Sequence, residues 1–207
     1  MQPTLLSVVT LRCASRALRT AEQAGAVLFV TILTAIAAQI SVPLPFTPVP
    51  FTFQPMVVLL GAAALGARLG AASQVLYLTL GLAGLPVFAA SPVLAQGAAR
   101  LLGPTGGYLM SYPLAALVAG SLAERGLDRR YLTAVLAMLC GLAVVFAGGL
   151  AWLAVVVQPA RGVSGALAAG FFPFIVADLL KLLVAAGVMP SLWWLSGAGA
   201  SDTPRRF

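Results

Sequence analysis

The sequence predicts an all-α integral membrane protein, a bundle of six transmembrane helices. Of its 207 residues, 61% are hydrophobic and 8% are charged, whereas a soluble domain carries about 25% charged residues. So few charges do not cover a water-facing surface. The apolar runs are also too long and continuous for the alternating strands of a barrel, and lipid otherwise admits only helices.

Six apolar runs approach the length of about 20 residues that a spanning helix needs. Four prolines in residues 43–50 exclude a helix after the first run. Pro173 is expected to break the sixth run near its start. Pro190 is expected to end its spanning part and to leave Trp193 and Trp194 as interfacial anchors. The expected spans are roughly 25–42, 54–67, 69–87, 106–123, 131–157 and 165–194.

The arginines predict that both termini are cytoplasmic. Six spans place only Arg100 and Arg161 on the outer side, and the other arginines on the cytoplasmic side, as the positive-inside rule requires. The chain then divides into a cytoplasmic segment 1–24, a single membrane domain 25–196 and a cytoplasmic tail 197–207. We expect a multi-pass protein of the bacterial inner membrane in contact with lipids. The net charge of +7 is attributed to arginines that set the orientation in the membrane, and it does not predict nucleic-acid binding.

Two charges stand inside the sixth apolar run. Asp178 and Lys181 are surrounded by apolar residues, while the other acidic residues lie in termini or between apolar runs. A charge at membrane depth costs about 2.5–3.5 kcal/mol on insertion scales, so it usually serves a ligand or a partner. At a spacing of three residues the two side chains share one helix face. Asp178 is predicted to accept hydrogen bonds from ligand N–H groups, and Lys181 to bind a carboxylate or to orient Asp178. The alternative is a structural ion pair.

A glycine-rich turn precedes the fourth span. Gly106 and Gly107 allow the backbone to approach a ligand closely, and Thr105 and Tyr108 offer hydroxyl groups. The alternative is a tight turn in which Thr105 caps the helix.

Three further residues are candidates for substrate contact. Arg100 is suited to an anionic ligand, although such an arginine often extends to lipid headgroups instead. The amide of Gln54 is suited to a ligand or to a neighbouring helix. Tyr77 is suited to the wall of an apolar pocket or to the core.

Small residues recur on one face of the first span. Thr31 and Ala35 form one pair at a spacing of four, and Thr34 and Ala38 form another. This pattern permits close helix contact and predicts a surface for a membrane partner.

Several functions are disfavoured by what the sequence lacks. It has no histidine, so it offers no histidine base or histidine metal site. No phosphate-binding GxxxxGK[ST] motif is present, so an ATPase activity is not expected. The prediction is a protein that is not an enzyme and carries no cofactor and no metal.

Four segments together resemble the BioY family, the biotin-binding S components of energy-coupling factor (ECF) transporters. They are Gln39–Gln54, Gly81–Phe88, Leu102–Leu109 and Asp178-Leu-Leu-Lys181. The resemblance runs in order from about residue 25 to 190. It departs from many relatives at residues 89–97, where they carry a glycine-rich stretch.

The resemblance implies the ECF S-component fold and a membrane subunit that captures biotin with high affinity. Its implied partners are biotin, a transmembrane coupling subunit and two ABC-type ATPase subunits. Asp178 would meet the ureido ring of biotin, with Lys181 beside it, and Arg100 is a candidate for the carboxylate. Two alternatives stay open, namely a self-sufficient proton-coupled secondary transporter or facilitator with Asp178 as its proton relay, and an S component for another vitamin.

Overall fold

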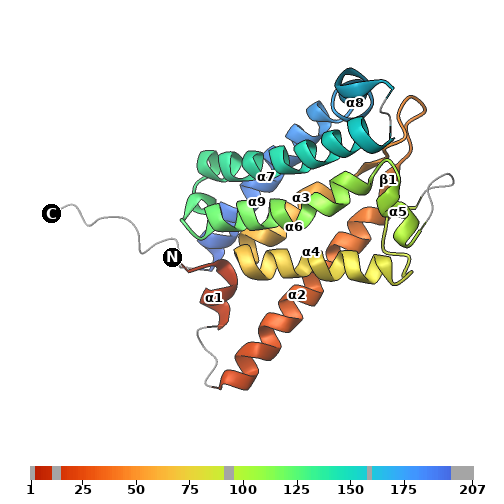
Figure 1. Ribbon diagram of the computed structural model, residues 1–207. Coiled ribbons are helices and arrows are strands. Elements are labelled where there is room, and N and C mark those ends of the chain that lie inside the picture. The colour runs from red at the N-terminus through yellow and green to blue at the C-terminus, as the bar shows by residue number, and fades with distance from the viewer. Residues whose placement is uncertain (1–2, 11–14, 91–95, 158–159, 197–207) are drawn as a thin grey trace.

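The computed structural model describes residues 3–10, 15–90, 96–157 and 160–196. Most of these residues are helical, and the long helices run side by side, with α5, α8 and β1 at one end of the molecule and α1 at the other (Figure 1). The elements in chain order are α1 (Leu5–Thr10), α2 (Arg16–Gln39), β1 (Ser41–Val42), β2 (Phe51–Thr52), α3 (Gln54–Leu65), α4 (Ala67–Leu82), α5 (Ala98–Leu102), α6 (Gly106–Ala123), the 3-10 turn η1 (Leu127–Arg129), α7 (Tyr131–Trp152), the π-helical turn η2 (Leu153–Val157), α8 (Gly162–Gly170) and α9 (Ile175–Leu195).

Within the described residues, three helical segments are long and apolar enough to cross a membrane: α2, Tyr131–Val157 and α9. Helix α3 is apolar but shorter. Helix α2 begins earlier than the predicted span because the Ser15 hydroxyl accepts the backbone N–H of Leu18 at 3.2 Å and caps the helix. The first helix therefore extends into the segment expected to precede the membrane. The predicted tail 197–207 lies outside the described residues.

The proline-rich run is not helical, as predicted. It forms the loop of a short antiparallel hairpin in which Ser41 pairs with Thr52 and Val42 with Phe51. Proline lacks an N–H to donate to a ladder, which keeps the pairing short. The hairpin places Phe51 and Thr52 beside α9.

The predicted break of the sixth span is confirmed, whereas Pro190 does not end the helix. Helix α8 stops at Gly170 and α9 starts at Ile175, on either side of Pro173. Pro190, however, lies inside α9, which continues to Leu195.

Contacts with the α6–α7 connection hold the last turns of α9. The indole N–H of Trp193 donates to the Asp128 carboxylate at 2.6 Å, and the Arg129 guanidinium lies 4.8 Å from the centre of the Trp193 ring. Trp193 is 2% exposed, so the expectation that it anchors the protein at the membrane interface is wrong. Trp194, 78% exposed, stays available for that role.

Helix α6 occupies the centre of the bundle, where it packs against α3, α4 and α7. Its inner faces carry small buried residues, and Gly120 is the tightest of these positions towards α4. A Cβ added at Gly120 would lie 2.5 Å from the backbone nitrogen of Ala67. The absence of a side chain therefore sets how closely α6 approaches the α3–α4 corner.

Asp128 is expected to make thermal stability depend on pH. Burial raises the pKa of this carboxyl group, against the hydrogen bond from Trp193 and the charge of Arg129, which lower it. The folded chain then holds the proton more readily than the unfolded chain, so the free energy of unfolding falls as pH rises above the ordinary carboxyl value of 3.8. Asp128→Asn keeps an acceptor for Trp193 but has no carboxyl group to titrate. Its melting temperature is therefore expected to fall less than that of wild type between about pH 4 and 7. Equal pH slopes for variant and wild type would contradict the prediction.

Candidate functional site

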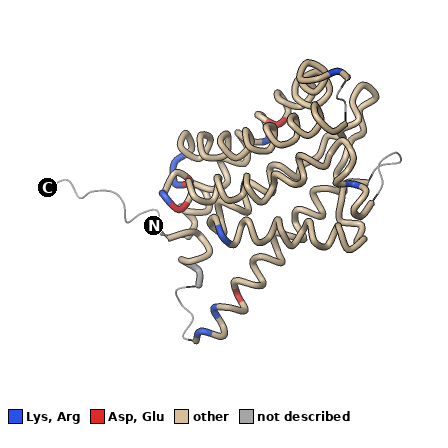
Figure 2. Tube along the Cα trace, viewed as in Figure 1, with Lys and Arg blue, Asp and Glu red and all other residues tan. Residues whose placement is uncertain are grey.

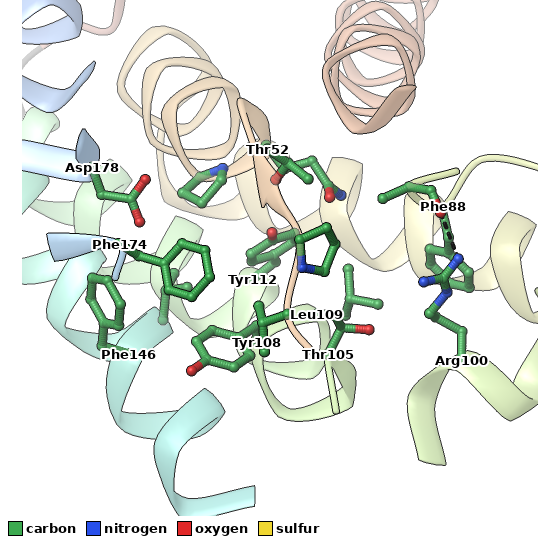
Figure 3. A pocket seen from close by; sticks show the side chains of 16 residues that line it. Thr52, Phe88, Arg100, Thr105, Tyr108, Leu109, Tyr112, Phe146, Phe174 and Asp178 are labelled. Atoms are coloured by element: carbon green, nitrogen blue, oxygen red, sulfur yellow. Dashed lines mark hydrogen bonds between the residues drawn. The ribbon is translucent and has the colours of Figure 1, made fainter. Parts of the chain in front are cut away.

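A largely apolar cavity opens among the hairpin, the loop after α4, and helices α6, α7 and α9. It encloses about 610 Å³ free of protein atoms, its open mouth included. Figure 3 shows Asp178 near one end, Arg100 near the other, and Phe174, Tyr108 and Tyr112 between them. Its lining residues are Val49, Pro50, Thr52, Gln54, Pro55, Phe88, Ala89, Arg100, Thr105, Tyr108, Leu109, Tyr112, Val145, Phe146, Phe174 and Asp178.

The Asp178–Lys181 pair on α9 is an ion pair with unequal access to the cavity. The two side chains meet at 2.8 Å through Asp178 Oδ1. Lys181 Nζ also donates to the Thr52 carbonyl at 2.7 Å and lies 3.4 Å from the centre of the Phe51 ring. Lys181 is therefore fully engaged, and it does not line the cavity. Asp178 does, and its Oδ2 accepts no hydrogen bond from the described residues. The geometry favours the orienting role of Lys181 over carboxylate binding.

Arg100 is the charged group at the opposite end of the cavity. It is 2% exposed, and its Nη2 donates to the carbonyl of Ala89. Its Nε and Nη1 are buried and find no partner among the described residues. Burial lowers the pKa of this guanidinium, which nonetheless stays cationic. A buried cation with unused N–H groups is suited to an anionic ligand group.

The backbone of Pro86–Ala90, which supplies Phe88 and Ala89 to the cavity, is held by side chains from other elements. Gln39 of α2 donates to the carbonyls of Pro86 and Phe88, at 3.3 and 3.2 Å. The other three carbonyls are also occupied. Val87 accepts from Tyr77, Ala89 from Arg100 and Gln96, and Ala90 from Ser41. This wall of the cavity is thus fixed without regular secondary structure. Residues 91–95, within the predicted outer loop, lie outside the described residues.

Two hydroxyl groups predicted to face a ligand have different surroundings. Thr105 lines the cavity, and its Oγ1 is buried without a partner among the described residues. It occupies the N-cap position of α6 but makes no side-chain cap. The Tyr108 ring lines the cavity, but its hydroxyl donates to the Gly170 carbonyl at 2.8 Å. Tyr108 is therefore positioned to contribute its ring face.

Gly106 and Gly107 do not line the cavity, which corrects their predicted role. A Cβ at Gly106 would overlap the carbonyl of Leu101, and one at Gly107 would lie 2.2 Å from the Cβ of Trp152. Trp152 also donates its indole N–H to the Gly103 carbonyl at 3.1 Å. Gly106 lets the start of α6 approach α5, and Gly107 lets α6 pack against α7; neither admits a ligand.

The predicted partner face of α2 is covered within the chain. Thr31, Thr34 and Ala38 are at most 1% exposed, and the Thr31 hydroxyl donates to the Ser73 carbonyl of α4 at 2.9 Å. Ala35 packs against the core. The pattern of small residues does mark a close helix contact, but the neighbour is α4, so the expectation of a partner on this face is wrong.

Gln54 and Tyr77 lie together, and only Gln54 lines the cavity. The prediction missed several wall residues. Tyr112 follows Tyr108 by one helical turn, a spacing that would have identified it. Phe146, Phe174 and Val145 carry no local signal, because an apolar residue in a membrane helix has the same pattern whether it faces lipid, core or ligand.

Comparison with known proteins identifies the fold and the family. The chain has a TM-score of 0.75 and 25% identity to the crystal structure of the S-component for biotin from an ECF-type ABC transporter, covering 86% of this chain and 94% of that one. It is 40% identical to the probable biotin transporter BioY of Pyrococcus horikoshii over 80% of this chain and 92% of the relative. It is 41% identical to the biotin transporter BioY of Thermotoga maritima over 75% of this chain and 86% of the relative.

The match is not confined to a few motifs. The model of the BioY family covers residues 10–198, which include every element from α2 to α9 and all residues of the cavity. The chain belongs to the BioY family.

Proposed function

We propose that this chain is a biotin-binding S component that captures biotin in the cavity between Asp178 and Arg100. The observation that carries the proposal is the pair of charges at opposite ends of an apolar cavity (Figure 3). Biotin has the complementary layout, with N–H donors on a cyclic urea at one end, a carboxylate at the other and an apolar middle. The names of the relatives support the same ligand.

Asp178 accepts a ureido N–H through Oδ2 while Lys181 neutralises the carboxylate from behind. Arg100 offers its unused N–H groups to the biotin carboxylate. The aromatic rings between them cover the fused rings and the alkyl chain. Lys181 already pairs with Asp178 and stabilises its charged form. This disfavours a proton relay at Asp178, and so disfavours the alternative of a proton-coupled transporter.

The proposed topology has six spans with both termini cytoplasmic. The spans are α2, α3, α4, α6, α7 and the α8–α9 pair. Figure 2 shows most basic residues towards the end that carries the α6–α7 connection. Arg100 lies in α5 and Arg161 directly precedes α8, and both helices are at the other end of the molecule (Figure 1). The positive-inside rule makes the first end cytoplasmic, so the cavity opens outward. Residues 1–24 and 197–207 then flank a single membrane domain, with α2 beginning inside the first segment.

As a subunit without a phosphate-binding motif, the chain depends on partners for energy. We propose the transmembrane coupling subunit and two ABC-type ATPases implied by the ECF context of the solved relative. It is not itself an enzyme and needs no cofactor. The relatives come from bacteria and archaea, so a cell membrane is proposed, and the bacterial inner membrane stays a prediction.

Equilibrium binding to the purified chain in nanodiscs, without any other subunit, tests the function. We expect saturable binding of biotin and weaker binding of biotinamide, in which a neutral amide replaces the carboxylate. Absence of biotin binding by folded protein would overturn the proposal.

Arg100→Met is expected to remove the preference for the carboxylate. A hydrogen bond to a charged group contributes about 1.5–3 kcal/mol, so biotin should lose roughly 10- to 150-fold in affinity while biotinamide loses much less. Arg161→Met, which removes an exposed arginine at the same end, serves as the control and should retain the preference. Equal losses for biotin and biotinamide would place the carboxylate elsewhere.

A further inference from the structure

The hydroxyl of Thr105 makes no hydrogen bond within the described part of the chain. Thr105 is 9% exposed and lines the cavity, and its Oγ1 is buried. It stands at the N-cap position of α6, but its backbone is helical, with φ −88° and ψ −6°. A capping residue is typically extended, which lets its oxygen reach the N–H groups of the first turn. The Thr105 hydroxyl therefore keeps its proton for another acceptor.

Thr105 lies at the Arg100 end of the cavity. The Gly103 N–H donates to the Arg100 carbonyl at 3.2 Å, and the Gly106 N–H donates to the Gly103 carbonyl at 3.0 Å. These two turns fold the chain back, so that Gly106 lies against the carbonyl of Leu101 with no room for a Cβ. The residue after Arg100 and the residue after Thr105 are thus in contact. Figure 3 shows Thr105 with its oxygen on the side of Arg100.

The unused groups at this end of the cavity are all donors. Arg100 Nε and Nη1 are buried without a partner among the described residues, as is Thr105 Oγ1. A buried donor without an acceptor is costly, and such groups are rare in folded proteins. A carboxylate has two oxygens and about four acceptor positions, so one ligand group can accept from both side chains.

We propose that Thr105 donates its hydroxyl proton to the ligand carboxylate beside Arg100. The inference rests on the proposed function and extends it, because it names a second donor for the carboxylate. Hydrogen bonds to an ionised acceptor are stronger than those between neutral groups, so a single hydroxyl contributes measurably. Arg100 supplies the charge, while Thr105 fixes the position of one carboxylate oxygen against the wall of the cavity.

Equilibrium binding in nanodiscs tests the contact with two ligands, biotin and the analogue in which a methyl group replaces the carboxylate. Thr105→Val removes the hydroxyl and keeps the shape of the side chain. Its affinity for biotin should fall by about tenfold or more, the lower part of the range for a hydrogen bond to a charged group. Its affinity for the methyl analogue should stay as in wild type, because that ligand has no carboxylate oxygen to accept the proton.

The ligand-free protein should respond differently from the complex. A methyl group in place of a buried, unpaired hydroxyl removes a desolvation cost, so the melting temperature of Thr105→Val should stay or rise. Loss of a helix cap would lower the melting temperature instead. A lower melting temperature together with unchanged biotin affinity would make Thr105 a cap and overturn the proposal.

Two further variants are the controls. Thr105→Ser keeps the hydroxyl and should bind biotin more tightly than Thr105→Val does. Thr79→Val is the same change at an exposed threonine of α4, whose hydroxyl donates to the Val75 carbonyl at 2.8 Å, and it should bind both ligands as wild type does. Equal losses in Thr105→Ser and Thr105→Val would assign the effect to shape and overturn the role of the hydroxyl.

The outcomes separate this contact from the function itself. If Thr105→Val binds biotin as tightly as wild type, the donor role of Thr105 is overturned while biotin binding stands. Equal losses for biotin and the methyl analogue would overturn the carboxylate as the group that Thr105 contacts. Thr105→Ala, which also lacks the hydroxyl, gives the same comparison if Thr105→Val does not fold. If wild type binds no biotin, the proposed function fails, and this inference fails with it.

Discussion

Asp178→Asn is expected to weaken biotin binding by roughly 100-fold, the upper part of the range for a hydrogen bond to a charged group. The carboxylate offers the cavity an acceptor, whereas an asparagine amide also carries an NH₂ group that opposes a ligand N–H. The substitution removes the charge and replaces one acceptor by a donor, while it keeps the size. Titration of purified protein in nanodiscs measures the effect.

Asp128→Asn is the matched control for this loss. Asp128 is also a buried acid, 2% exposed, but it contacts Trp193 at the α6–α7 connection and does not line the cavity. It should bind biotin as wild type does. Wild-type affinity in Asp178→Asn would remove Asp178 from the site.

Lys181→Met is expected to cost about 3–5 kcal/mol of stability, because it leaves the Asp178 carboxylate in the membrane without its cation. It also removes the donor to Thr52 and the cation above Phe51, so the hairpin loses its tie to α9. Chemical or thermal unfolding in nanodiscs gives the change in stability. A loss within experimental error would show that the pair is solvated.

The double variant Asp178→Asn/Lys181→Met separates stability from binding. With the acid neutralised, no unpaired charge remains, and part of the lost stability should return. Biotin affinity should stay low, because the ligand has lost its charged acceptor. Recovery of affinity together with stability would mean that Asp178 serves only the fold.

Helix positions were predictable because composition and prolines determine them. The break beside Pro173 follows from its missing N–H. The continuation of α9 past Pro190 was not predictable, since the helix there is held by the tertiary contact of Trp193 with Asp128. The early start of α2 did have a local signal in Ser15, the capping residue.

The charged ends of the site were predictable, and its walls were not. Asp178 is conspicuous because a charge is costly in a membrane span, and Arg100 because the positive-inside rule leaves few arginines outside. Glycine and small-residue patterns proved ambiguous. Gly107 and Thr34 both mark close approach of helices, and only tertiary structure shows that the neighbour is part of the same chain.

The support of Pro86–Ala90 has a consequence for how this segment tolerates sequence change. Its hydrogen bonds are accepted by backbone carbonyls, which every amino acid possesses. Substitutions in the segment, other than at the buried Phe88 and Ala89, therefore leave the hydrogen bonds in place. The constraint falls instead on distant donors such as Gln39 and Tyr77. The sequence of this segment can therefore change while donors from the surrounding elements maintain its backbone conformation.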